Sequence, residues 1–275
     1  MLCLGIESTA HTFSCAITER KGKKGRLLSD VRKIYRPPAG QGIHPREASR
    51  HHAENSPEVL AECLKKANVQ IDDVDMISYA AGPGLGPCLR IGAVVARSLA
   101  SYYDIPIYPV NHALGHIELG KMLTGAKDPL VLLVSGGHTM ILAFLSKKWR
   151  VFGETLDITV CQLLDQIGRY AGFASPCGPK IEELASQSTE YVPLPYVVKG
   201  NDVSFSGLLS ATKRIIPKGM EAACFSLQET AFSMMGEATE RALSFTGKKE
   251  LLVVGGVAAN KRLSHILSSI CTRHG

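Results

Sequence analysis

The sequence predicts an α/β fold made of two similar halves, because it carries nearly the same pentamer twice. STAHT occupies residues 8–12 and SGGHT occupies residues 135–139. Each pentamer lies between apolar runs, a pattern that predicts a β-hairpin around a turn of small residues. The match extends without a gap, since STAHTFSCAI aligns with SGGHTMILAF. Each half therefore begins with the same hairpin, unless two hairpins with polar turns are alike by coincidence.

The first half alternates between strand and helix patterns. We expect strands at residues 2–8, 12–19, 31–36, 76–82 and 105–110, and helices at residues 47–69, 91–103 and 111–125. The basic run over residues 21–26 is interpreted as a solvated hairpin tip. Ser56 and Pro57 are compatible with a restart of the long helix, with Ser56 as its N-cap. Alternating strands and helices are typical of the α/β class.

The second half repeats the hairpin and then becomes mostly helical. We expect strands at residues 130–134 and 250–256, a loop leading into a helix over 175–187, and helices at 158–173, 203–216, 225–247 and 257–275. The stretch TGAKDP near residue 125 is the expected linker. It divides the chain into an N-terminal half, residues 1–125, and a C-terminal half, residues 126–275.

Composition places the chain among ordinary globular proteins. It has 275 residues, 45% of them hydrophobic, and a net charge of +6. This mild basicity permits a nucleic-acid partner without establishing one. The N-terminus lacks a secretory signal, no apolar run approaches 20 residues, and no CxxC pair occurs among the eight cysteines. We expect a cytoplasmic protein without a membrane span, with Cys15, Cys63 and Cys224 as buried free thiols.

Three glycine-containing turns are candidate phosphate sites. Loops of Ser, Gly and Thr expose backbone N–H groups and hydroxyls that bind phosphates without much charge. Two equivalent loops could hold a nucleotide from both sides. A third turn, VVGGVAAN, follows a predicted strand, and its pair Gly255-Gly256 lets a ligand approach the backbone. The alternative for each loop alone is an ordinary tight turn.

Histidines are concentrated in two places. His112 and His116 are four residues apart in a predicted helix, so they share a face and could bind one metal ion. Asn111 is a natural N-cap before them, and Ala113 replaces the glutamate of HExxH proteases. The alternative is a pair of surface histidines. HPREASRHH, residues 44–52, could be catalytic, could hold a metal, or could be a polar helix start.

Several carboxylates are candidates for metal or ribose binding. An acid at the end of a strand, such as Glu7, can position magnesium or a water. Glu182 lies near a predicted helix N-terminus, where it could meet a ribose hydroxyl or simply be a favourably placed acid. The candidate acids are Glu7, Glu154, Asp157, Asp165 and Glu182.

Repeated hairpin loops resemble the actin, Hsp70 and sugar-kinase superfamily, and longer strings resemble one family within it. These strings are GIESTAHT, GIHPREASRHHAE, AAGPGLGPCLRIGAVVARSLA, VNHALGHIELG, LVSGGHT, FGETLDITV, GPKIEELA, VSFSGL, FSLQETAF and VVGGVAANKRL. Together they are similar to the tRNA N6-adenosine threonylcarbamoyltransferase family, across essentially the whole chain. IHPREA and HHAE are more similar to its archaeal and eukaryotic branch, whose member is the catalytic subunit of the KEOPS complex.

The resemblance implies a fold of two related α/β halves around a central nucleotide cleft, and a defined reaction. Family members move a threonylcarbamoyl group from threonylcarbamoyl-AMP to N6 of the adenine 3′ of the anticodon, in tRNAs that read ANN codons. The implied cofactors are one iron or zinc ion and an ATP- or AMP-type nucleotide in the cleft, which Mg²⁺ could accompany. Implied partners are tRNA, a small atypical protein kinase and a small dimerising subunit.

The resemblance also assigns residues. His112 and His116 correspond to metal ligands. Glu7, Ser8 and His138 would line the catalytic site. The remaining ligand-binding positions would be Val134, Ser135, Gly136, Gly137, Asp165, Gly178, Glu182 and Asn260.

Some positions depart from the family pattern. Leu133 stands where many relatives have a tyrosine ligand, and Cys161 and Cys177 stand where glycine is usual. A C-terminal aspartate ligand of the family is not found before Gly275, so we expect the sequence to omit a C-terminal portion. Three other readings are an O-carbamoyltransferase, a kinase of the same fold, and a nucleotide-binding subunit without catalysis.

Overall fold

The computed structural model describes residues 1–22, 24–38 and 40–275, and it divides into two compact units. Unit 1 comprises Met1–Pro37 and Gly42–Gly115, and unit 2 comprises Pro38–Gln41 and His116–Gly275. The division falls inside a helix, whereas the sequence placed a boundary at the linker near residue 125. Each unit is described by itself.

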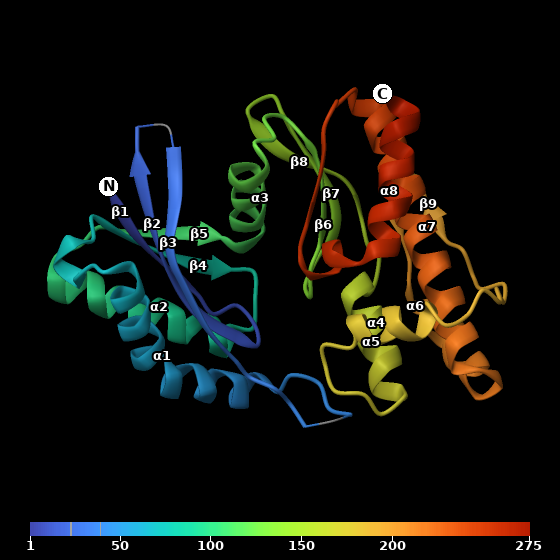
Figure 1. Cartoon of the computed structure of the whole chain (residues 1–275), viewed down its shortest axis with the longest axis horizontal. Helices are drawn as coiled ribbons and strands as arrows, with labels where there is room; N and C mark the ends of the chain where they lie inside the picture. The colour runs from blue at the N-terminus through green and yellow to red at the C-terminus, as the bar shows by residue number, and fades with distance from the viewer. Residues whose placement is uncertain (23, 39) are drawn as a thin grey trace. The chain divides into compact units, whose positions relative to one another are not determined.

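Unit 1 is a five-stranded mixed sheet with two helices on it (Figure 1). Its elements are β1 (Leu2–Glu7), β2 (Thr12–Lys21), β3 (Lys24–Ile34), α1 (Pro45–Ala67), η1 (Ile71–Asp73), β4 (Met76–Gly82), α2 (Gly86–Tyr103), β5 (Ile107–Asn111) and the start of α3 (His112–Thr124). The strand order is β3-β2-β1-β4-β5. The first three strands are antiparallel, and β4 and β5 continue parallel to β1. Lys23 of the expected basic tip lies outside the described residues.

The core of unit 1 lies between this sheet and the helices α1 and α2. Leu4, Phe13, Val59, Ile77 and Ala96 are buried members of it. Buried and partly exposed side chains alternate along β1 and β2, because successive side chains of a strand point to opposite faces of the sheet. Every second side chain therefore faces the helices. Cys15 and Cys63 are free and buried in this core, as predicted.

The expected restart of the long helix is wrong, because α1 runs unbroken through Pro57. Proline has no N–H, so it leaves the carbonyl of Ala53, four residues earlier, without its helical partner. The hydroxyl of Ser56 donates to that carbonyl at 3.3 Å. Ser56 thus compensates for the proline inside the helix instead of capping a new one.

Unit 2 contains a four-stranded sheet in the order β11-β6-β7-β8 and a two-stranded sheet in the order β10-β9. Its elements are β6 (Leu130–Val134), β7 (Thr139–Leu145), β8 (Lys148–Glu154), α4 (Val160–Tyr170), α5 (Gly178–Ala185), β9 (Val198–Lys199), β10 (Asp202–Val203), α6 (Ser206–Ile215), η2 (Ile216–Lys218), α7 (Met220–Thr246), β11 (Leu251–Val254), η3 (Gly256–Ala259) and α8 (Lys261–His274). The antiparallel hairpin β6–β7 extends to β8, and β11 lies parallel to β6 on its other side.

The core of unit 2 is built around the long helix α7. Leu227, Phe232 and Met235 of α7 pack with Leu132 of β6 and Leu163 of α4. A helix that is buried on most of its faces belongs in a core rather than at a surface. Cys224 of α7 is buried and free, as predicted.

The two predicted hairpins are present, but their registers differ. β1 pairs with β2 so that Glu7 faces Ser14, whereas β6 pairs with β7 so that Val134 faces Thr139. The residues between the paired positions are therefore six in unit 1 and four in unit 2. The sequence alignment placed Thr12 over Thr139 without a gap, so it found the equivalent strands but not the wider loop of unit 1.

Candidate functional site

Glu7 lies at the end of β1 and interacts with the first residue of α3. Its Oε2 is 2.9 Å from Nδ1 of His112, and its Oε1 accepts a hydrogen bond from the N–H of Thr9 at 2.5 Å. Burial by itself raises the pKa of Glu7, but the hydrogen bonds from His112 and Thr9 outweigh it and hold the pKa below its ordinary value. Glu7 is therefore an ionised carboxylate at neutral pH.

The loop after Glu7 is held in place by two other segments of unit 1. The N–H of Leu85 donates to the carbonyl of Thr9 at 2.7 Å. Nε2 of His52, in α1, lies 2.9 Å from the carbonyl oxygen of Ala10. His52 is fully buried, and burial is the largest cause that lowers its pKa. The HPREASRHH segment thus contributes a neutral histidine that supports this loop.

Ser8 occupies a buried position in the same loop. Its side chain belongs to a residue that is 1% exposed, and its hydroxyl has no hydrogen-bond partner among the described residues. The hydroxyl lies against Gly92 of α2, where an added Cβ would collide with it. Ser8 is thus packed against α2, while the catalytic role that the resemblance implies stays a prediction.

Helix α3 carries the predicted metal pair. Oδ1 of Asn111 accepts hydrogen bonds from the N–H groups of Ala113 and Leu114, at 2.9 and 3.2 Å, so the predicted N-cap is confirmed. His112 and His116 follow, one turn apart. Among the described residues no group of three or more His, Cys, Asp and Glu side chains is arranged to hold an ion.

The environment of His112 suits a metal ligand. Metal-bound histidines commonly donate the N–H of one ring nitrogen to a carboxylate, which fixes the tautomer and directs the other nitrogen at the metal. When Nδ1 of His112 carries the proton, it donates to the ionised Glu7. Nε2 then carries the lone pair, which is the donor that iron and zinc accept. The chemistry of this donor set therefore fits a transition-metal ion.

The glycine loop of unit 2 is a closed turn with exposed glycines. The N–H of Ser135 donates to the carbonyl of His138 at 2.9 Å, and the Ser135 hydroxyl lies 3.1 Å from Nδ1 of His138. Gly136 and Gly137 are exposed, and a Cβ added to either would meet no atom within 4 Å. Packing does not require glycine here. An approaching ligand, in contrast, would gain close access to the backbone.

Two neighbouring elements position this loop. The Thr159 hydroxyl donates to the carbonyl of Gly136 at 3.0 Å and also accepts from Gln162 as the N-cap of α4. Gly255, at a φ of 104°, lies against the backbone of Val134 and Ser135 so closely that a Cβ would collide with it. The third glycine turn and the first loop of this unit are therefore in contact, as one phosphate-binding region would require.

The remaining predicted residues of unit 2 connect α4, α5 and α8 through the N-termini of α5 and α8. Oδ1 of Asp165 accepts from the N–H of Cys177, directly before Gly178, at 2.7 Å. Oε1 of Glu182 accepts from the N–H of Lys261 at the start of α8, at 2.8 Å. Positive ends of helix dipoles favour anions, so this region suits a nucleotide.

Asn260 has a structural role in this arrangement. Its Oδ1 caps α8 by accepting from Arg262 and Leu263, and its Nδ2 donates to Oε1 of Gln228 at 2.9 Å. These bonds place Asn260 directly before Lys261, whose N–H binds Glu182. A direct contact between Asn260 and a nucleoside stays a prediction.

The three positions that depart from the family pattern lie in the interior or close to it. Leu133 is buried in β6, Cys177 is buried at the start of α5, and Cys161 is half-buried in α4. Burial, and then the negative charge of Asp165, raise the pKa of Cys161 to about 11 and also raise the pKa of Cys177. Both thiols are therefore protonated at neutral pH.

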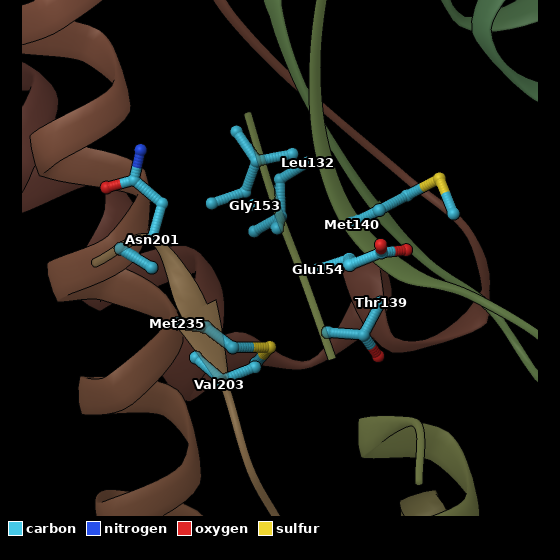
Figure 2. A pocket seen from close by; sticks show the side chains of 10 residues that line it. Leu132, Thr139, Met140, Gly153, Glu154, Asn201, Val203 and Met235 are labelled. Atoms are coloured by element: carbon cyan, nitrogen blue, oxygen red, sulfur yellow. The ribbon is translucent and has the colours of Figure 1, made fainter. Parts of the chain in front are cut away.

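A small cavity lies beside β7 and β8 but is not a substrate site. Leu132, Thr139, Met140, Glu154 and Met235 are among its lining residues (Figure 2). Its volume is about 10 Å³, which is room for a water molecule at most. Asn201 and Gly153 are both labelled in Figure 2. The backbone carbonyl of Asn201 leaves no space for a Cβ at Gly153.

Sequence reasoning missed some residues that hold the candidate site. Thr159 and Gln162 form a capping box, a spacing that the sequence shows and that predicts a helix start at Val160. Thr9 and Gln228 gave no comparable signal. Their contacts join positions that are distant in the sequence or depend on the backbone of a loop.

Comparison with known proteins gives a consistent result. The family described as tRNA N6-adenosine threonylcarbamoyltransferase (TsaD) matches residues 27–275. A protein of that name from Pyrobaculum calidifontis is 45% identical over 274 residues, which cover 99% of this chain and 80% of that protein. A probable bifunctional tRNA threonylcarbamoyladenosine biosynthesis protein from Methanothermobacter thermautotrophicus is 50% identical, and the chain spans 51% of its length.

Solved structures with low identity show the fold. HypF from T. kodakarensis superposes with a TM-score of 0.67 at 13% identity, covering 98% of this chain and 44% of that one. Component A of the Acidaminococcus fermentans (R)-2-hydroxyglutaryl-CoA dehydratase gives 0.61 at 14% identity, covering 98% and 88%. These likenesses confirm the expected α/β class of the actin, Hsp70 and sugar-kinase kind.

None of the helices in the described part of the chain combines the length and the apolar character that crossing a bilayer takes. The family match covers most of the chain, and the Pyrobaculum relative extends it to nearly all of it. The chain therefore belongs to the tRNA N6-adenosine threonylcarbamoyltransferase family.

Proposed function

We propose that the protein containing this chain transfers the threonylcarbamoyl group of threonylcarbamoyl-AMP to N6 of adenine 37, 3′ of the anticodon, in tRNAs that read ANN codons. The observation that carries the proposal is the family match over residues 27–275. tRNA is the substrate of this family, whose enzymes depend on a metal and use a nucleotide-derived substrate.

Helix α3 would supply the metal ligands. His112 and His116 would hold one iron or zinc ion, and Glu7 would orient His112 through its contact with Nδ1. When bound, such an ion supplies Lewis-acid polarisation of a carbonyl oxygen. Ser8 would act from within the same loop as a support, because its side chain is buried.

Unit 2 would bind the nucleotide part of the substrate. The backbone of Val134, Ser135, Gly136 and Gly137 would meet the phosphate or carbamoyl end, since this turn is exposed at its glycines. The region of Asp165, Gly178, Glu182 and Asn260 would receive the nucleoside. Mg²⁺ would accompany the phosphates of any bound ATP.

The reaction needs little covalent chemistry from the protein. N6 of adenine attacks the carbamoyl carbon, a C–N bond forms, the C–O bond to the phosphate breaks and AMP leaves. The proton of N6 goes to a base, for which His138 is our candidate, because it directly follows the exposed glycines of the loop that would meet the carbamoyl end. Oriented N–H donors that stabilise the developing charge would supply much of the rate enhancement.

We further propose that the protein acts in the cytoplasm with a small atypical protein kinase and a small dimerising subunit. The word "bifunctional" in the name of the Methanothermobacter relative, half of whose length lies outside this match, supports a functional partner. Co-purification of the chain with these two proteins at defined stoichiometry is the expected result.

A transfer assay tests the proposed reaction. Threonylcarbamoyl-AMP, tRNA, the chain and the partner subunits are mixed, and the tRNA is digested and analysed for threonylcarbamoyladenosine by mass spectrometry. We expect product that depends on the chain. Carbamoylation or phosphorylation of a small molecule instead would favour an O-carbamoyltransferase or a kinase of this fold. Nucleotide binding without any product would favour a regulatory subunit.

The metal assignment has its own test. We expect the double variant H112A/H116A to lose bound metal and at least 100-fold of the transfer rate while it keeps its circular dichroism spectrum. The control is H265A/H274A, which removes two histidines from α8. Full metal occupancy in H112A/H116A would refute the assignment.

A further inference from the structure

Three connections of unit 2 meet at one end of its sheet. Nζ of Lys248, after α7, donates to Asp128, before β6, and to the carbonyl of Phe144 at the end of β7. Oε2 of Glu250 accepts from the N–H groups of Lys127 and Asp128, at 3.0 and 2.9 Å. These bonds fix the α3–β6, β7–β8 and α7–β11 connections beside one another.

Basic residues are concentrated where these connections meet. The exposed ones are Lys127, Lys147, Lys148, Arg150 and Lys249, and together they are named here the basic end surface. The carboxylates in the same connections, Asp128 and Glu250, are engaged with Lys248 and with backbone N–H groups. The surface therefore has an excess of positive charge, in a chain whose net charge is only +6.

Exposed aromatic rings lie within or next to this charge. Phe144 is 43% exposed and packs at an edge against Trp149, with ring centroids 5.6 Å apart. Phe245 is 79% exposed, and its ring lies 5.9 Å from that of Phe152 in β8. Such exposed rings give nothing to the core. They can, however, stack on nucleotide bases, whose faces are all π surfaces.

The turn between β7 and β8 places one lysine at its tip and a second directly after it. Ser146 and Lys147 have φ angles of 51° and 62°, a left-handed conformation for which Asn-Gly is the preferred sequence. A lysine in this conformation costs more free energy than glycine would. Lys147 is therefore in the turn and Lys148 is the first residue of β8, and both are exposed. Figure 1 shows the turn that joins these two strands.

We propose that the basic end surface binds the sugar–phosphate backbone of RNA, with Phe144 and Phe245 available for base stacking. Interleaved lysines and exposed rings are the features that recognise nucleic acid without reading its sequence. If the proposed function holds, the RNA is the tRNA substrate. The surface lies at the opposite end of the seven-residue strand β7 from the SGGHT loop, about 20 Å away for six steps of roughly 3.4 Å. It would therefore set the affinity for tRNA and not the chemical step.

The experiment compares two triple charge reversals by fluorescence anisotropy with labelled tRNA. K147E/K148E/K249E alters the basic end surface. The matched control, K21E/K24E/R26E, alters three exposed basic residues at the other basic hairpin, β2–β3. We expect the first variant to lose at least tenfold in affinity at 0.1 M salt and the control to lose less than threefold.

Salt dependence and stacking provide two further readouts. The plot of log K against log salt has a negative slope, and loss of three phosphate contacts makes that slope shallower by about 2 to 3. We expect K147A/K148A/K249A to show this change. F245A should weaken binding of single-stranded RNA by about fivefold or more, since base stacking contributes roughly 1 kcal/mol or more. Y102A, which removes an equally exposed ring of unit 1, should not.

The outcomes separate this proposal from the proposed function. In the transfer assay we expect the surface variant to raise KM for tRNA at least tenfold with kcat within twofold. If the surface variant forms product with an unchanged KM for tRNA, the proposed RNA surface is refuted and the proposed function still stands. Absence of product from the unaltered protein, with tRNA binding still lost in the surface variant, would overturn the function alone. Three results would refute RNA binding by the basic end surface. They are equal losses of affinity in both charge reversals, no RNA binding by the unaltered protein, and capture of an acidic protein in place of RNA.

Discussion

Glu7 shows how one carboxylate can orient a neighbouring histidine ring. It is ionised, accepts from Thr9 and lies 2.9 Å from Nδ1 of His112. We expect E7Q to weaken metal affinity by about 10- to 100-fold, because an amide no longer fixes the tautomer or raises the basicity of the ring. Affinity is measured by competition with a chelator. The control is E118Q in α3, the helix that contains His112, because the carboxylate of Glu118 pairs with Lys121.

Gly168 shows the close packing between α4 and the start of α5. A Cβ at this position would lie 2.5 Å from Sγ of Cys177. We expect G168A to destabilise the protein by about 1–3 kcal/mol through overpacking, although alanine normally favours a helix. In the control G207A, in α6, the added Cβ meets nothing within 4 Å, so no loss is expected. Urea unfolding measures both, and a G168A midpoint equal to or above that of the unaltered protein would contradict the prediction.

At the scale of elements, Asp157 joins the loop before α4 to the start of α6. Its carboxylate accepts from the hydroxyls of Ser204 and Ser206 at 2.6 Å and from the N–H groups of Ile158, Phe205 and Ser206. Burial raises its pKa, but these hydrogen bonds outweigh burial and lower the pKa well below its ordinary value. The residue thus holds together two segments that the sequence gave no reason to pair.

We expect D157N to lower the free energy of unfolding by about 1 kcal/mol or more at pH 7, because Nδ2 of asparagine cannot accept the hydrogen bonds that Oδ2 of Asp157 accepts from Ser204 and Ser206. Because the folded pKa is depressed, the contribution is complete above the unfolded value of about 4 and is lost as pH falls below it. The difference between the two proteins should therefore shrink between pH 4 and pH 2, as followed by urea titrations. D72N, an exposed aspartate of η1, should show no such trend.

The sequence predicted those features of the fold and of the candidate site whose signal lies within a short stretch of residues. The paired hairpins, the N-cap Asn111 and the buried thiols were predictable from short patterns. Strand β8 was missed, although KWRV alternates charged and apolar residues as a strand with one exposed face does. The role of His52 was not predictable, since its partner Ala10 is 42 residues away. The Ser56 restart failed because a side chain replaced the hydrogen bond that Pro57 removes.

At the scale of the whole molecule, each unit has a hydrophobic core of its own. One described cluster draws only on residues of unit 1, including Phe13, and the other only on residues of unit 2, including Phe232. Both phenylalanines are fully buried, so replacement by alanine should cost about 3–5 kcal/mol. Separate cores allow separate cooperative units, each with its own free energy of opening.

Hydrogen exchange measured by mass spectrometry should therefore respond in one unit at a time. We expect F13A to speed exchange of the amides in β1, β2 and β4 while those of β6 and α7 keep their protection. F232A should do the reverse, and the two variants serve as controls for each other because they remove the same side chain from the two cores. Faster exchange throughout the chain in both variants would show one cooperative unit, in which a core defect anywhere would weaken helix α3 and the glycine loop together.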